Sequence, residues 1–250
     1  MSVNESNTFS YKKAFKDYIT EFVMLFAAVT LGFFAENLRE GYAEMKLERQ
    51  LMKSMVADLT RNEELLLSQR ASLNSRRIAC DSIAYFFNQK DIRQYGADLY
   101  MYARRLGYYG GEYPLSSRSL DQLKNSGLFS IISKDVVADS LSNYDNLKTE
   151  YEQRIKWYFE DVKKVQDINK IIFDARVFEK ATIYTNEYAF KIMRPEGNPA
   201  LLTYNEADLQ KYYNTFYYLR RNTETQLKDV TALIESTVKL KQLITKEYAF

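Results

Sequence analysis

The chain has 250 residues, of which 46% are hydrophobic, and this apolar content argues against a disordered chain. Its eight glycines and three prolines supply too few turn residues for an all-β protein, so helices are expected nearly throughout. The 35 basic and 33 acidic side chains are interleaved and leave a formal net charge of +2. This balance is typical of solvated helix faces, and a nucleic-acid partner is not expected.

Histidine is absent and cysteine occurs once, at Cys80. Without histidine, Ser-His-Asp and Cys-His nucleophiles and the two-histidine zinc helix are excluded. A single cysteine can form neither an intrachain disulfide nor a paired-cysteine metal or redox motif. The sequence also lacks a phosphate-binding glycine loop and a carboxylate calcium loop. No catalytic residue, cofactor-binding residue or metal ligand is predicted, and the protein is expected not to be an enzyme.

An uncharged apolar run extends from Phe22 to Ala35. As a helix this run covers roughly 21 Å, which is less than the hydrocarbon core of a bilayer. Adding residues 18–20, with the Glu21 carboxylate reaching toward the headgroups, extends the segment to roughly 27 Å against a core of about 30 Å. The run therefore predicts one transmembrane helix.

Two other interpretations of this run are a cleaved signal peptide and the core helix of a soluble protein. The run ends in Phe33-Phe34-Ala35-Glu36 without the small residues of a cleavage site, which disfavours cleavage. The core helix remains an alternative. The expected organisation is a short cytoplasmic segment (1–17), a transmembrane anchor (18–38) and a helical-bundle domain (39–250).

The charges around the anchor bear on its orientation. Three lysines precede it and three basic residues follow it, so the count of positive charges is tied. The lysines, Lys12, Lys13 and Lys16, form the tighter cluster, which favours an N-terminus in the cytoplasm. The anchor is then expected in the inner membrane, with the large C-terminal domain in the periplasm. Glu21 and Glu36 are expected at the two interfaces, and a role for either in proton or ion handling stays open.

Beyond the anchor, apolar side chains recur every three or four residues and predict a long helix that packs in a bundle or against itself. They are Leu38, Tyr42, Met45, Met52, Val56, Leu59, Leu66 and Leu73. A second segment is expected from about Ser75 to Asn88 and a third from about Ile92 to Leu106, closed by Gly107. The following GYYGGEYP sequence predicts a loop. Its tyrosines, Tyr108, Tyr109 and Tyr113, are candidate contacts for a protein partner, and packing on the bundle is the alternative.

A short helix is expected next, with Ser119 as its N-cap, Gln122 completing a capping box and Gly127 as the left-handed residue that ends it. Leu128, Phe129, Ile131 and Ile132 are then expected to dock on the core, and Ser133 to cap a long helix. The helical spacing of apolar residues continues from about Lys134 to Ile183, with a break left open near Asn169 or Asp174.

The last helix begins after a loop over residues 194–200, with Asn205 as its N-cap, and runs nearly to Phe250. Five aromatic residues are concentrated near its start: Tyr212, Tyr213, Phe216, Tyr217 and Tyr218. Neighbouring residues point in different directions around a helix, so about half of this set should face the core. Tyr212, Tyr217 and Tyr218 are the candidate contacts for a protein partner, since a protein interface is favoured over a base-stacking platform.

Two stretches resemble a family of small, N-terminally membrane-anchored helical proteins of unknown function that is widespread in Bacteroidota. The first is EFVMLFAAVTLGFFAENLRE (21–40), and the second is SLDQLKNSGLFSIISKDVVADSLSNYDNL (119–147). The family pattern usually carries a tryptophan just beyond the membrane, where this chain has Arg39 and Glu40. The resemblance implies a single anchor and a helical extramembrane domain, and it implies no catalytic residues.

Together these patterns predict an all-α protein in which one N-terminal transmembrane helix continues into an extramembrane bundle of long helices. The leading hypothesis is a non-enzymatic accessory or scaffold subunit that binds the lipid bilayer and holds a protein partner or a second copy of itself. The alternative is a single-span ligand sensor with a small-molecule pocket in the bundle. No cofactor is expected, and a small-molecule partner is less favoured than a protein partner.

Overall fold

The computed structural model describes the backbone of residues 5–107, 114–185 and 190–250, and the side chains of these residues from Phe15 onward. The fold is 83% helical and 3% strand, which confirms the prediction of an all-α protein. The chain divides into two compact units, residues 1–53 and 54–250. The second unit begins at Ser54 and not at residue 39, where the bundle domain was expected to begin.

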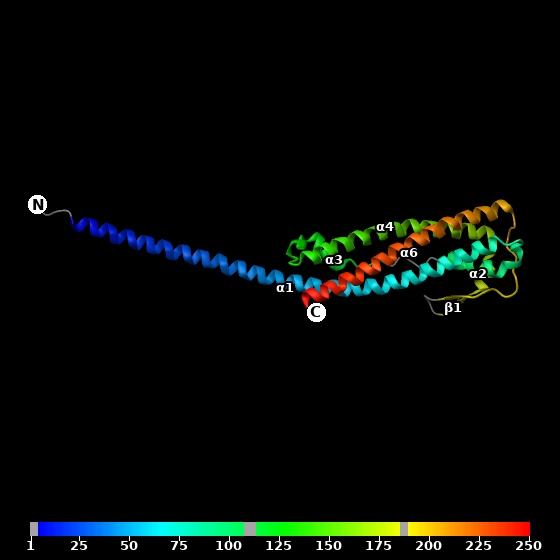
Figure 1. Ribbon diagram of the computed structural model, residues 1–250, viewed down its shortest axis with the longest axis horizontal. Coiled ribbons are helices and arrows are strands. Elements are labelled where there is room, and N and C mark those ends of the chain that lie inside the picture. The colour runs from blue at the N-terminus through cyan, green and yellow to red at the C-terminus, as the bar shows by residue number, and fades with distance from the viewer. Residues whose placement is uncertain (1–4, 108–113, 186–189) are drawn as a thin grey trace. The chain divides into compact units, whose positions relative to one another are not determined.

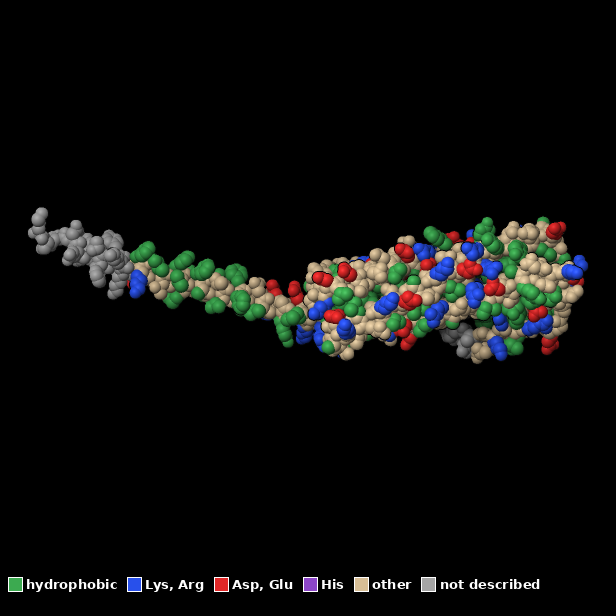
Figure 2. Space-filling view, in the orientation of Figure 1, with side chains coloured by type: hydrophobic (Ala, Val, Ile, Leu, Met, Phe, Trp, Pro, Cys, Tyr) green, Lys and Arg blue, Asp and Glu red, His purple; other side chains and the backbone are tan. Residues whose placement is uncertain are grey.

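The first helix, α1, runs without interruption from Glu5 to Phe87. The predicted boundary between two helices near Ser75 is therefore wrong. No glycine or proline occurs between Gly41 and Gly96 to end the helix. Over residues 15–40 of α1 every described side chain is exposed, the apolar ones included, and Figure 2 shows apolar side chains along the face in view. Phe22, Leu25 and Phe33 are 67%, 66% and 71% exposed.

The apolar side chains predicted to pack along α1, from Leu38 to Leu73, are buried only in the later part of the helix. Leu38, Tyr42 and Met45 are exposed, and in the second unit the buried positions include Leu59, Leu66 and Leu73.

The second unit is built from three long helices (Figure 1). These are residues 54–87 of α1, α4 (Asp135–Ile172) and α6 (Glu206–Tyr248). Hydrogen bonds join Asn62 to Tyr144 and Arg76 to Tyr158, so α1 and α4 run parallel. Helix α6 is antiparallel to both, because Arg220 pairs with Asp81 of α1 at 2.7 Å and Asp229 pairs with Arg154 of α4 at 2.7 Å.

The predicted apolar stripes of α4 and α6 form the core between these helices. The fully buried members include Val137, Leu141, Tyr144, Val162, Val165, Ile172, Phe216, Val230 and Ile244. At the start of α6 the Asn205 side chain accepts hydrogen bonds from the backbone N–H groups of Ala207 and Asp208, at 2.9 and 3.2 Å. The prediction of Asn205 as the N-cap is thereby confirmed.

Helix α4 ends at Ile172, so the break left open near Asn169 or Asp174 is present and the helix does not continue to Ile183. Phe173 is extended, and the Asp174 carboxylate caps a separate short helix, α5 (Ala175–Lys180). The chain then forms strand β1 (Thr182–Tyr184), which pairs antiparallel with β2 (Phe190–Ile192). Apolar residues continue through this stretch, and the break follows from the Asp174 cap and not from a change in hydrophobic spacing.

Four shorter helices complete the described unit: η1 (Ile92–Tyr95), α2 (Gly96–Leu106), α3 (Arg118–Asn125) and η2 (Leu128–Ile131). Gly107 ends α2, and Gly127 has φ +70°, so both predicted stops are confirmed. Ser119 does not cap α3, since the helix begins one residue before it and its N-cap residue is Ser117. The N-cap residue of α4 is likewise Lys134 and not Ser133. Of Leu128, Phe129, Ile131 and Ile132, only Ile132 is buried.

A polar cluster holds the start of α3 against α1. The Asp58 carboxylate accepts hydrogen bonds from the Ser116 hydroxyl at 2.7 Å and from the Ser119 backbone N–H at 2.9 Å. The buried Asn62 amide donates to the Ser116 carbonyl at 2.8 Å and to the Tyr144 hydroxyl at 2.9 Å, and it accepts from the Ser116 N–H at 2.7 Å. These bonds satisfy polar groups that burial would otherwise leave unpaired.

Burial acts to raise the pKa of Asp58, but the hydrogen bonds from Ser119 and Ser116 and the nearby Arg118 charge outweigh it. The net result is a pKa below its usual value. A carboxylate with a lowered pKa in the folded state stabilises the fold above its unfolded pKa of about 4, and this contribution is lost as the pH falls through the folded pKa.

Replacing Asp58 by Asn should lower the free energy of unfolding at pH 7 by about 1–2 kcal/mol, because charge-assisted hydrogen bonds are lost. The variant should also lose less further stability than the wild type between pH 5 and pH 2. Chemical denaturation followed by far-UV circular dichroism in mild detergent measures both effects. The matched control is Asp139→Asn at an exposed position of α4. Equal acid sensitivity of Asp58→Asn and the wild type would contradict the assignment.

Candidate functional site

The six tyrosines predicted as partner contacts fall into three groups. Tyr108, Tyr109 and Tyr113 lie outside the described residues. Tyr212 is fully buried, and Tyr217 and Tyr218 are 47% and 65% exposed.

Tyr212 belongs to an aromatic cluster at the start of α6. Its ring centroid lies 5.6 Å from that of Phe87, 5.6 Å from that of Phe173 and 5.8 Å from that of Phe216. Burial raises the pKa of the Tyr212 hydroxyl, which has no hydrogen-bond partner among the described residues. As a contact residue for a partner, Tyr212 was the wrong choice, because it lies on the buried stripe that continues with Leu219.

Two candidate tyrosines and one residue missed by sequence reasoning are available on the surface. The rings of Tyr217 and Tyr218 meet edge to face with centroids 5.7 Å apart. Trp157 on α4 is 65% exposed, as much as Tyr218. The apolar stripe of α4 runs through Tyr151, Tyr158 and Val162, and Trp157 lies beside it. This position in the sequence indicates that Trp157 is exposed. Tryptophan and tyrosine are enriched at the centres of protein interfaces.

A shallow groove of about 680 Å³ lies between α4 and α6, and Asp161, Lys164, Lys211 and Tyr218 are among its lining residues. Across it the Asn222 amide donates to the Asp161 carboxylate, and Lys164 pairs with Asp161 at 2.7 Å.

Trp157 precedes Asp161 by one turn on α4, and Tyr218 precedes Asn222 by one turn on α6. Because the two helices are antiparallel, the aromatic residues flank the Asp161–Asn222 pair on opposite sides. We call the surface made by Trp157, Asp161, Lys164, Lys211 and Tyr218 the α4–α6 face.

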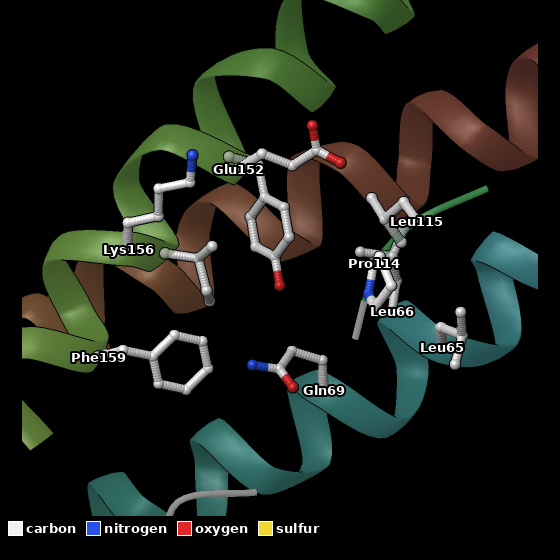
Figure 3. Close-up of a pocket in the computed structure, with 10 residues that line it drawn as sticks. Leu65, Leu66, Gln69, Pro114, Leu115, Glu152, Lys156 and Phe159 are labelled. Atoms are coloured by element: carbon white, nitrogen blue, oxygen red, sulfur yellow. The ribbon is translucent and has the colours of Figure 1, made fainter. Parts of the chain in front are cut away.

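A smaller cavity of about 220 Å³ lies between α1, α4 and the Pro114–Leu115 segment (Figure 3). Its lining is mainly apolar, with two neutral polar and two charged residues. The lining residues are Leu65, Leu66, Gln69, Pro114, Leu115, Tyr151, Glu152, Ile155, Lys156 and Phe159. Sequence reasoning did not locate this cavity, although Gln69 interrupts the apolar side of a leucine-rich stretch of α1.

The side chains best suited to covalent or metal chemistry are not arranged for it in the described part of the chain. Burial raises the pKa of the Cys80 thiol to about 12, so the thiol stays protonated and unreactive at neutral pH. Across the same residues, no group of three or more histidine, cysteine, aspartate or glutamate side chains is placed to hold a metal ion.

No protein-family model, curated protein or solved structure matches the chain. The resemblance to a membrane-anchored family from Bacteroidota therefore stays a prediction.

Tyr212 and Tyr218 should respond in opposite ways to truncation. Tyr212→Ala removes a fully buried ring and should lower the free energy of unfolding by roughly 3–5 kcal/mol, as buried aromatic truncations do. Tyr218→Ala, at an exposed position on the same helix, should change it by less than about 0.5 kcal/mol. Thermal and chemical denaturation measure the difference, and similar losses in the two variants would contradict the core placement of Tyr212.

Proposed function

We propose that the protein is a single-span, membrane-anchored and non-enzymatic accessory or scaffold subunit whose helical bundle holds a protein partner. The observation that carries the anchor is the exposure of apolar side chains around the full circumference of α1 over residues 22–35. Helix α1 is long and apolar enough to cross a membrane, and none of its most apolar window is buried. Within the described residues no other helix meets this criterion.

The exposure favours a membrane span over the core helix of a soluble protein. A core helix of a soluble protein would be mostly buried, whereas Leu25, Phe26 and Leu31 are 66%, 63% and 66% exposed. Polar groups in the run are satisfied within the helix, as a hydrocarbon environment requires. The Thr30 hydroxyl donates to the Phe26 carbonyl at 2.8 Å. Just beyond the run, Arg39 donates from Nε to the Glu36 carboxylate at 3.0 Å.

The proposed location is the inner membrane, with the N-terminus in the cytoplasm and the bundle in the periplasm. This orientation rests on the tight cluster of lysines before the anchor, at positions 12, 13 and 16. Glu36 is assigned to the interface, where its pairing with Arg39 offsets its charge. No further role for Glu21 or Glu36 is part of the proposal.

The α4–α6 face supports the binding of a protein partner. It offers an exposed tryptophan and an exposed tyrosine beside a groove that contains Lys164, Lys211 and the Asp161–Asn222 pair. Large aromatic side chains surrounded by polar groups are the usual composition of a protein interface centre and its rim. The partner can be a different protein or a second copy of this chain.

The full-length chain should remain in the membrane pellet after an alkaline carbonate wash. Leu25→Lys combined with Leu31→Lys should shift it to the soluble fraction or prevent its accumulation, because each lysine near the helix centre opposes insertion by about 2.5–3.5 kcal/mol. Fractionation and immunoblotting measure the distribution.

The matched control for the anchor is Leu25→Val combined with Leu31→Val, which should stay in the pellet. A wild-type chain found in the supernatant without detergent would refute the anchor. Protease added to spheroplasts should digest the bundle, and protection of the bundle there would reverse the proposed orientation.

Gentle detergent extraction followed by native mass measurement should give a mass greater than that of one chain. Trp157→Ala combined with Tyr218→Ala should reduce this mass to that of a monomer while leaving the helical content unchanged, since both side chains are exposed. Tyr85→Ala, at a position on α1 that is 60% exposed, should keep the complex. A wild-type chain that stays a lone monomer would count against the scaffold function.

A further inference from the structure

The cavity between α1, α4 and the Pro114–Leu115 segment has an apolar wall built by side chains far apart in the sequence. Leu66 and Phe159 are 1% and 9% exposed, and Leu115 is 7% exposed. Leu65, Pro114 and Ile155 complete the apolar lining. A concave apolar site with a few polar groups is the common form of a small-molecule site in proteins.

Two neutral polar side chains line this apolar cavity without a partner in the described part of the chain. Tyr151 is 6% exposed, and no described residue hydrogen-bonds to its hydroxyl. Burial raises the pKa of Tyr151, so the hydroxyl is neutral and can both donate and accept. Gln69 is half-buried, and its amide nitrogen is directed into the cavity in Figure 3. A ligand with a hydroxyl group can bond to both side chains, because the tyrosine hydroxyl and the amide each donate and accept hydrogen bonds.

The charged residues of the lining are directed elsewhere. Glu152 pairs with Lys148 at 2.8 Å. In Figure 3 the Glu152 carboxylate and the Lys156 ammonium lie away from Gln69 and Phe159, so only the stems of these side chains contribute to the wall. No charge is therefore available inside the cavity to balance a charged ligand, and burial would disfavour one.

The volume limits the size of the ligand. An apolar cavity of about 150 Å³ accommodates benzene, and this cavity measures about 220 Å³. We propose that it binds an uncharged aromatic molecule of two fused rings that carries a hydroxyl group, with the rings against Leu66 and Phe159 and the hydroxyl group bonded to Tyr151 and Gln69. This binding is independent of the scaffold function, so either can fail without the other.

The probe that tests the proposal is 2-naphthol, titrated into the full-length protein in lipid nanodiscs, with empty nanodiscs subtracted. One saturable site per chain is expected, and 2-naphthoate should not occupy it. Tyr151→Phe and Gln69→Leu should each weaken binding about fivefold to tenfold, as expected for the loss of one hydrogen bond. Leu65→Trp should abolish binding because the larger side chain fills the cavity.

Matched controls separate loss of the site from loss of the fold. Leu67→Trp places the same side chain on α1 at a position that is 40% exposed, and Tyr85→Phe removes a hydroxyl at a position that is 60% exposed. Both should bind 2-naphthol as the wild type does, and circular dichroism should give equal helical content for all variants. No saturable binding to the wild type, or equal binding to the wild type and Leu65→Trp, would overturn the proposal.

Discussion

Apolar side chains on every side of one helix constrain this protein more than any other feature. Between Phe22 and Ala35 the helix has no polar face to turn toward water. Its apolar side chains are also not covered by any other described part of the chain. Removing apolar surface from water is favourable by roughly 25 cal/mol for each Å². For an apolar helix of this length, the lipid core of a membrane is the environment that would remove that surface from water. The proposed anchor rests on this constraint.

The bundle of the second unit depends on a different principle, the pairing of polar groups between buried stripes. Apolar stripes bring α1, α4 and α6 together without fixing their register closely. The hydrogen bonds of Asn62 with Tyr144 and Ser116, and the ion pair of Arg154 with Asp229, are directional and tie particular turns to each other. The buried Asn62 amide in particular would be unfavourable if unpaired, and so it disfavours shifted packings.

At some positions where the chemistry is local the sequence predicted the structure, although the N-caps expected at Ser119 and Ser133 lie at Ser117 and Lys134. Gly127 and Asn205 act through their own backbone conformation or through bonds to residues two or three positions away, so their roles could be inferred from a short window. A break in α4 near Asn169 or Asp174 was left open, and the sequence could not decide it because the apolar spacing continues beyond Ile172. The cap at Asp174 competes with helix extension, and nothing in the periodicity indicates which of the two prevails.

The candidate site was harder to predict because exposure depends on angular position and on distant residues. Tyr212 and Tyr218 differ by less than two helical turns, yet one is fully buried and the other is 65% exposed. The cavity combines Gln69 with Tyr151, which meet only because α1 and α4 run parallel. No short stretch of sequence contains both sides of such a site.

The antiparallel return of α6 has a consequence for how the chain can be shortened. Lys241 of α6 pairs with Glu63 of α1, and 178 positions separate the two residues. Contacts within the α4–α6 pair, such as Arg154 with Asp229, span 75 positions. The bond that ties the end of α6 to α1 is therefore available only once nearly the whole polypeptide has been made. A product truncated before Lys241 leaves the partly buried Glu63 carboxylate without this partner, although most of the α4–α6 pairing is retained.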